Sequence, residues 1–109
     1  MADNLVLQIY RFTEAFPTNE RFGLQSQLRR SAVSIASNIV EGSARRGPGE
    51  YRNFLNIATG SSAETAYLID VSFRLGFIKD GDHKRLGRGY ADLTASLKAL
   101  VQSLERRAD

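Results

Sequence analysis

Residues 24–42 read LQSQLRRSAVSIASNIVEG, and this stretch decides the fold. Apolar residues return in it every three or four positions, which is the spacing of one face of an α-helix. They are Leu24, Leu28, Ala32, Ile35 and Ile39. The stretch ends at Gly42, where a glycine-rich segment begins. The pattern therefore predicts an amphipathic helix that ends near Gly42 and buries one face.

The same periodicity recurs in three other segments. An apolar stripe over residues 5–16 stops at Pro17, because a proline restricts the residue before it. The longest stripe covers residues 48–75, where a proline suits the first turn and Gly76 can cap the end in the left-handed conformation. A fourth stripe runs from Leu86 to Leu104 and follows a capping sequence at residues 80–82. Four helices are therefore expected.

The connections between these helices are short, which favours antiparallel neighbours. A chain of 109 residues that is 42% apolar has the size and composition of one globular core. Alternation typical of β-strands does not occur. We predict an all-α fold, an antiparallel up-down-up-down four-helix bundle, as a single domain over residues 1–109.

The composition argues against several classes of chemistry. The chain has no cysteine and one histidine, His83, so it cannot form a disulfide framework, a thiol nucleophile or the paired Glu-x-x-His motifs of a di-metal bundle. Its serines lack a nearby His-Asp arrangement. No apolar run is long enough to span a bilayer, and none resembles a signal peptide. We expect a non-enzymatic protein without metal, cofactor or membrane partner, located in the cytoplasm.

Two bands of small side chains fall in the middle of the second and third helices. They cover residues 31–37 and residues 58–63. Small residues let two helices approach closely, so we expect the bands to face each other within the bundle or to meet a neighbouring subunit. Gly60 costs roughly 1 kcal/mol against alanine inside a helix, and a close contact there is the expected compensation.

Three polar residues are candidates for a buried network. Asn38 and Glu41 are one helical turn apart, and Glu64 lies on or near the apolar side of the third helix. A carboxylate in such a place is expected to be paired. We predict that Asn38, Glu41 and Glu64 form a structural polar network that fixes the register of the helices, and not an active site.

The basic residues are unevenly distributed, within a net charge of +3. Residues 24–52 carry five arginines against Glu41 and Glu50. These arginines are Arg29, Arg30, Arg45, Arg46 and Arg52. A guanidinium group suits a phosphate bidentately, and Tyr51 nearby could stack on a base. The pattern indicates a nucleic-acid-binding surface, while a solvated helix face with one or two salt bridges is the alternative.

Residues 27–42 resemble the signature of the four-helix-bundle proteins associated with intervening sequences of bacterial 23S ribosomal RNA. Further similarity follows in order at Phe16-Pro17, residues 50–64 and residues 75–78. The resemblance implies a ring-like homo-oligomer, with a pentamer favoured, and a basic surface for nucleic acid, above all structured RNA. A related branch, the accessory proteins of diversity-generating retroelements, implies the alternative: a scaffold that docks a protein such as a reverse transcriptase.

Two departures from the family pattern affect these expectations. Ala36 stands where the family commonly has proline, which predicts a straighter second helix with a complete set of backbone hydrogen bonds. The family also usually carries more helix before the segment that matches residues 5–16. A short first helix would leave one end of the third helix uncovered, so a neighbouring subunit covers it or apolar surface stays exposed.

Overall fold

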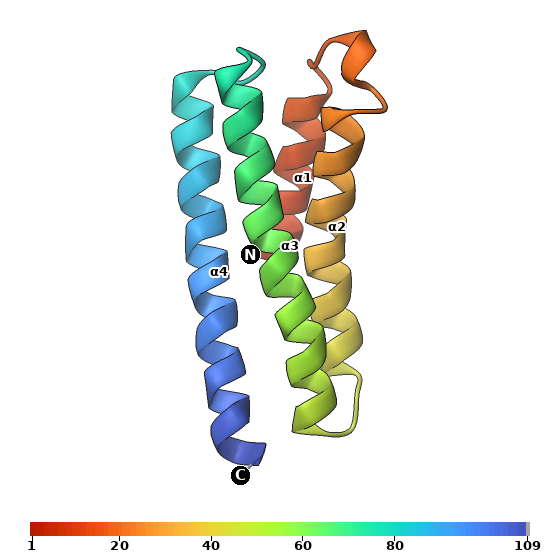
Figure 1. The fold of residues 1–109 in the computed structure, drawn as a ribbon, viewed down its shortest axis with the longest axis vertical. Helices are drawn as coiled ribbons and strands as arrows, with labels where there is room; N and C mark the ends of the chain where they lie inside the picture. Colours follow the sequence, from red (N-terminus) through yellow and green to blue (C-terminus); the bar gives the residue numbers. More distant parts are fainter. Residues whose placement is uncertain (109) are drawn as a thin grey trace.

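The computed structural model describes residues 1–108, and the chain forms four α-helices in this range. They are α1 (Ala2–Thr13), α2 (Leu24–Ser43), α3 (Pro48–Arg74) and α4 (Asp80–Ala108), with a short 3-10 helix, η1 (Thr18–Glu20), between α1 and α2. The helices run alternately up and down (Figure 1). The predicted fold class and the four predicted helices are confirmed.

The four helices surround one apolar core. The spacing that predicted α2 is confirmed, because Leu28, Ala32 and Ile35 are at most 1% exposed. Leu55 of α3 and Leu86 of α4 are completely buried in the same core. Complete removal of such side chains from water is the main force that holds an amphipathic bundle together.

The end of α3 shows why the chain turns where it does. Gly76 has a φ of 85°, in the left-handed region that glycine adopts without strain. Its N–H donates to the carbonyl of Phe73, and the N–H of Phe77 donates to the carbonyl of Ser72, both at 2.9 Å. These two bonds form a Schellman motif, which satisfies carbonyls at the helix end. The predicted glycine cap is confirmed.

The two bands of small side chains face each other inside the bundle, as predicted. Ser34 Oγ of α2 lies 3.0 Å from Ser61 Oγ of α3, and Thr65 Oγ1 lies 2.7 Å from Ser31 Oγ. Between α3 and α4, Ser62 Oγ lies 2.7 Å from Thr94 Oγ1. We call these residues the hydroxyl seam: Ser31, Ser34, Ser61, Ser62, Thr65 and Thr94. The seam ties α3 to both of its neighbours.

The expected close contact at Gly60 is wrong. Gly60 is exposed, and a Cβ atom built on it would meet nothing within 4 Å. The close approach of α2 and α3 occurs instead at Gly42, where a Cβ atom would stand 2.7 Å from Cβ of Phe54 and 2.9 Å from Cδ1 of Tyr51. Glycine is required there because any larger side chain would collide with α3.

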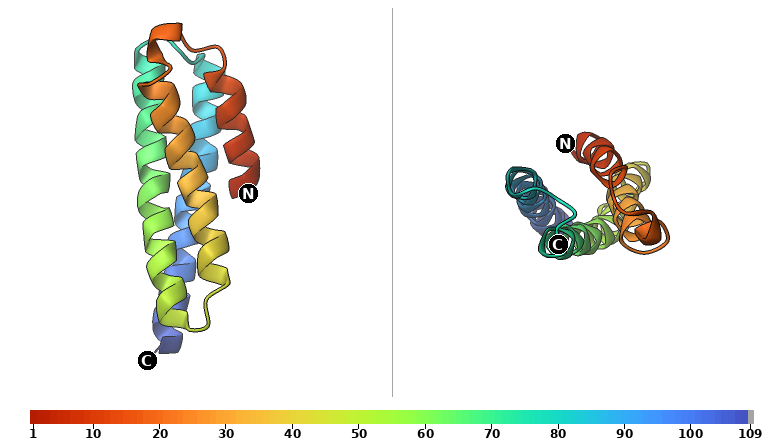
Figure 2. Two further views of the ribbon diagram at one scale, coloured as in Figure 1. Left: turned by 90° about the vertical axis from the view of Figure 1, so that its right-hand side faces the viewer. Right: turned by 90° about the horizontal axis from the view of Figure 1, so that it is seen from above.

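Helix α1 is much shorter than its neighbours. Its 12 residues span roughly 18 Å, whereas the 29 residues of α4 span roughly 44 Å. The N-terminus of α1 consequently lies near mid-height of the bundle (Figure 1). Seen from above, α1 lies across the bundle from α3 and between α2 and α4 (Figure 2). The expectation of an uncovered end on α3 is therefore wrong: the short helix leaves α2 and α4 uncovered.

Candidate nucleic-acid interface

The five candidate arginines form two groups at opposite ends of α2. Arg29 and Arg30 lie in its second turn, while Arg45, Arg46 and Arg52 surround the loop that leads into α3. Sixteen residues of nearly continuous helix separate Arg29 from Arg45, which corresponds to roughly 24 Å. The structure therefore does not bring the five guanidinium groups into one patch.

Arg29 makes its contacts within the chain. Its Nε donates to Thr13 Oγ1 at 2.8 Å, and its Nη2 lies 3.2 Å from Glu14 Oε2. The guanidinium group also stands over the ring of Tyr10, 4.6 Å from the centroid. Because these three partners belong to the end of α1 and its C-cap, Arg29 anchors α1 to α2. This tie connects residues 16 positions apart and was not foreseen from the sequence.

Arg45 is also engaged, but more weakly. Its Nη2 lies 3.4 Å from Oε1 of Glu41, one helical turn earlier. Its guanidinium group also lies over the ring of Phe54, 4.9 Å from the centroid. Both members of the ion pair are well exposed, and exposed pairs of this kind contribute about 1 kcal/mol at most. A stronger anionic ligand can therefore displace Glu41 at little cost.

Three of the predicted arginines lack an ion-pair partner within the part of the chain that the structure describes. They are Arg30, Arg46 and Arg52. Arg30 and Arg46 are exposed, and Arg52 is half-buried. Arg21, in the turn before α2, is exposed and likewise has no ion-pair partner among the described residues. Arg21 was not among the candidates predicted from the sequence, although the neighbouring Phe22 in a polar turn is a signal of an unusual surface.

The predicted network of Asn38, Glu41 and Glu64 does not form. Asn38 donates to the carbonyl of Ser34 at 2.7 Å and contacts neither glutamate. Glu41 and Glu64 are both exposed. Glu64 borders an open polar cavity of about 340 Å³ between α2 and α3. The next residue, Thr65, is buried in place of Glu64. The hydroxyl seam therefore links α2 to α3, which is the role that the network of Asn38, Glu41 and Glu64 was predicted to have.

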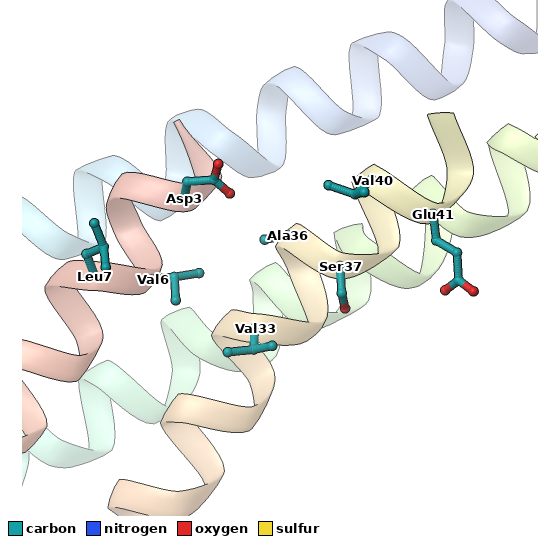
Figure 3. A pocket seen from close by; sticks show the side chains of 8 residues that line it. All are labelled: Asp3, Val6, Leu7, Val33, Ala36, Ser37, Val40 and Glu41. Atoms are coloured by element: carbon teal, nitrogen blue, oxygen red, sulfur yellow. The ribbon is translucent and has the colours of Figure 1, made fainter. Parts of the chain in front are cut away.

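An apolar groove runs between α1 and α2, with a volume of about 650 Å³ (Figure 3). Val6 and Leu7 of α1 and Val33, Ala36 and Val40 of α2 line it. Leu7 is 52% exposed and Val40 is 65% exposed. Its remaining lining residues are Asp3, Ser37 and Glu41. An opening of this size with so much exposed apolar surface is typical of an interaction site.

A second cavity of about 350 Å³ continues below the start of α1. Ala36, Ile39 and Val40 of α2 face Leu93 and Ser96 of α4 across it. These side chains are the ones that a longer α1 would cover. The shortness of α1 therefore has a direct effect on the surface, because it extends the apolar groove toward α4.

The contacts of His83 fasten α4 to α3. Its ring stacks on Phe73 with centroids 4.0 Å apart, and its Nε2 lies 3.3 Å from Asp70 Oδ1.

Within residues 1–108 no three side chains of the kinds that bind metals gather at one place. None of the helices in this range combines the length and the mean hydropathy that crossing a membrane requires.

The fold defines the class of protein: it is a small antiparallel four-helix bundle (Figure 1). Residues 1–99 match the family described as 23S rRNA-intervening sequence protein. The chain therefore belongs to this family, as the resemblance of residues 27–42 predicted.

The fold is similar to that of a solved structure. This is the crystal structure of a protein with unknown function from the S23 ribosomal protein family, from Bacteroides thetaiotaomicron VPI-5482. The TM-score is 0.84 at 20% sequence identity, over 93% of this chain and 91% of that chain. At this identity the likeness shows the shared fold alone. No curated protein matches the chain significantly.

Proposed function

We propose that this protein is a non-enzymatic, homo-oligomeric bundle in the cytoplasm that binds structured RNA through its arginines. The observation that carries the proposal is that Arg30, Arg46 and Arg52 have no ion-pair partner among the described residues. An unpaired guanidinium group offers its full set of donors to a phosphate. The family description, which refers to 23S rRNA, agrees with this ligand.

The separation of the arginines favours an extended ligand. The groups at the two ends of α2 are roughly 24 Å apart, so a single small phosphate compound cannot reach both. A folded RNA presents many phosphates over such a distance, and contacts to phosphates position a protein on nucleic acid without reading its sequence. We therefore expect affinity with little sequence preference.

Self-association through the apolar groove supports the same function. Leu7, Val33 and Val40 lose their contact with water if a second copy of the chain covers them. The groove also carries Asp3 and Glu41, which basic side chains of a second copy would neutralise. A ring, for which the family resemblance implies a pentamer, would repeat the arginine groups and raise the affinity for RNA by multivalency.

The test is the salt dependence of RNA binding, measured together with the mass by light scattering. We expect a stable oligomer that takes up a structured RNA at low salt and loses it as salt rises, because each phosphate contact releases counterions. Replacing Arg30, Arg46 and Arg52 with glutamine should lower the slope of log K against log salt by about 1 per lost contact. Lys98→Gln on α4 is the matched control, because it removes an exposed charge from a helix that does not pack against α2. An affinity that ignores salt would contradict the proposal.

A protein-docking scaffold is the second candidate, with a partner such as a reverse transcriptase. The apolar groove favours it, because a protein partner could cover Leu7 and Val40 in place of a second copy. Val40→Lys separates the two: loss of the oligomer in light scattering supports self-association. An intact oligomer that ignores RNA supports the scaffold. An enzyme would be supported only by a measurable turnover that Glu64→Gln abolishes without unfolding the protein.

A further inference from the structure

A cavity of about 470 Å³ lies at the end of the bundle where the turn after η1 leads into α2. It is separate from the centre of the apolar groove and shares only Val33 with it. Its volume falls within the roughly 300–1,000 Å³ of small-ligand sites. Its lining combines aromatic, basic and polar side chains: Tyr10, Arg21, Phe22, Gln25, Ser26, Arg29, Arg30 and Val33.

Two aromatic rings in this cavity are open to solvent. Phe22 is 91% exposed, the largest exposure of any large apolar residue in the described chain, and Tyr10 is 42% exposed. Arg29 covers one face of Tyr10 and is held in place by its bond to Thr13. One aromatic group of the cavity is therefore fixed, and the other offers a free flat surface.

The lining of this cavity is positively charged, because it contains three arginines and no acidic residue. Glu14 pairs with Arg29 at 3.2 Å. Glu20 accepts a hydrogen bond from the backbone N–H of Leu24 at 3.2 Å, which caps the start of α2. Arg21 and Arg30 stay exposed on the same cavity, and neither has an ion-pair partner in residues 1–108.

We infer that this cavity binds one unpaired nucleotide of a bound RNA, with the base stacked on Phe22 and the phosphate held by Arg21 and Arg30. A free aromatic face beside unpaired guanidinium groups is the combination that single-stranded nucleic acid needs, because every base has a face to stack and every nucleotide has a charge. Bases in loops can enter such a cavity, whereas bases in a duplex are already stacked and paired. The inference rests on the proposed RNA binding and names the part of the RNA that is recognised.

The experiment compares two RNAs with equal numbers of phosphates: a hairpin with an unpaired loop and a blunt duplex. The variant is Phe22→Ala, and Ile57→Ala on α3 is the matched control, because Ile57 is 53% exposed and remote from the cavity. Phe22→Ala should weaken hairpin binding by about 5- to 100-fold, the range for loss of one base stack, and leave duplex binding within about twofold. Both variants should keep the wild-type melting temperature, because exposed side chains contribute little to stability.

A second readout does not depend on affinity. A 2-aminopurine base placed in the hairpin loop should lose fluorescence when it stacks in the wild-type cavity, and it should keep more of that fluorescence with Phe22→Ala. Equal loss of hairpin and duplex binding, or no effect of Phe22→Ala on the hairpin, would overturn the inference and leave the proposed RNA binding intact. A wild-type protein that binds neither RNA would overturn both and leave Phe22 as an anchor for a protein partner.

Discussion

The two sides of α2 differ in how completely they are covered. On the side of α3, the hydroxyl seam and a row of fully buried apolar residues close the interface. On the side of α1, Val33 and Val40 are left 41% and 65% exposed. Both neighbours are amphipathic helices, but α3 has 27 residues and α1 has 12. The difference shows that apolar residues outside the main stripe of α2, such as Val33 and Val40, stay exposed beside a short partner helix.

The largest expected difference in stability is between a buried side chain of α3 and an exposed side chain in the apolar groove. Leu55→Ala removes a completely buried side chain of α3 and should lower the free energy of unfolding by about 2–5 kcal/mol. Leu7→Ala in the groove should change it by about 0.5 kcal/mol or less in the monomer, because Leu7 is already 52% exposed. Urea unfolding followed by circular dichroism checks both variants at one protein concentration. Equal losses would mean that the groove is closed in solution.

The next largest effects on stability are expected at two glycines. Gly42→Ala should lower the free energy of unfolding by about 1–3 kcal/mol, because the new Cβ atom would collide with Phe54 and Tyr51 across the α2–α3 interface. Gly60→Ala should raise it by about 0.4–1 kcal/mol, because the new methyl group meets nothing and alanine restricts the unfolded chain. Thermal and urea unfolding test both. A loss at Gly60 would show that another surface approaches α3 there.

A smaller loss of stability is expected when a hydroxyl group of the hydroxyl seam is removed. Thr65→Val keeps the shape of the side chain and removes the hydroxyl that lies 2.7 Å from Ser31 Oγ and 2.8 Å from the carbonyl of Ser61. The free energy of unfolding should fall by about 0.5–1.5 kcal/mol. Ser37→Ala is the control, because the exposed Ser37 hydroxyl contacts only the carbonyl of Ser34 in its own helix. If both variants are equally stable, the seam contributes shape and not hydrogen bonds.

Another small effect at neutral pH is expected at Tyr90. Its hydroxyl is the only buried side-chain polar atom without a hydrogen-bond partner in the described residues, so Tyr90→Phe should change stability by about 1 kcal/mol at most at pH 7. Burial raises the pKa of the Tyr90 phenol above its usual value. Above pH 10 the unfolded phenol loses its proton while the folded one keeps it, so folding loses up to about 1.4 kcal/mol per pH unit. Urea unfolding between pH 8 and pH 11 should show a shallower loss for Tyr90→Phe, and identical slopes would contradict it.

Most of the fold could be predicted because its signals are local. The spacing of Leu28, Ala32 and Ile35 depends on the geometry of one helix, and Gly76 ends α3 for a reason that lies within five residues. The order of the helices around the core followed from short connections. What the sequence did not show is which helix ends stay uncovered, because that depends on how α1 lies between α2 and α4.

The candidate site was harder to predict because it depends on partners far along the chain. The sequence shows that Arg29 is basic, but only the fold shows that Thr13 and Glu14 engage it. Glu64 and Thr65 differ by one position, which is 100° around a helix, and that rotation decides which of them is buried. Arginines without a partner can therefore be identified only after the acidic residues have been placed.

The short α1 also has a consequence for the order in which the protein opens. A helix of 12 residues is marginal on its own in water, and α1 is held by α2 and by a small contact with α4, including Leu5 against Gly89. Its amide hydrogens should exchange with deuterated solvent through local detachment, while those in the middle of α3 exchange only when the whole domain unfolds. The molecule would thus behave as a persistent three-helix body with a detachable fourth element, whose protection rises whenever something occupies the groove beside it.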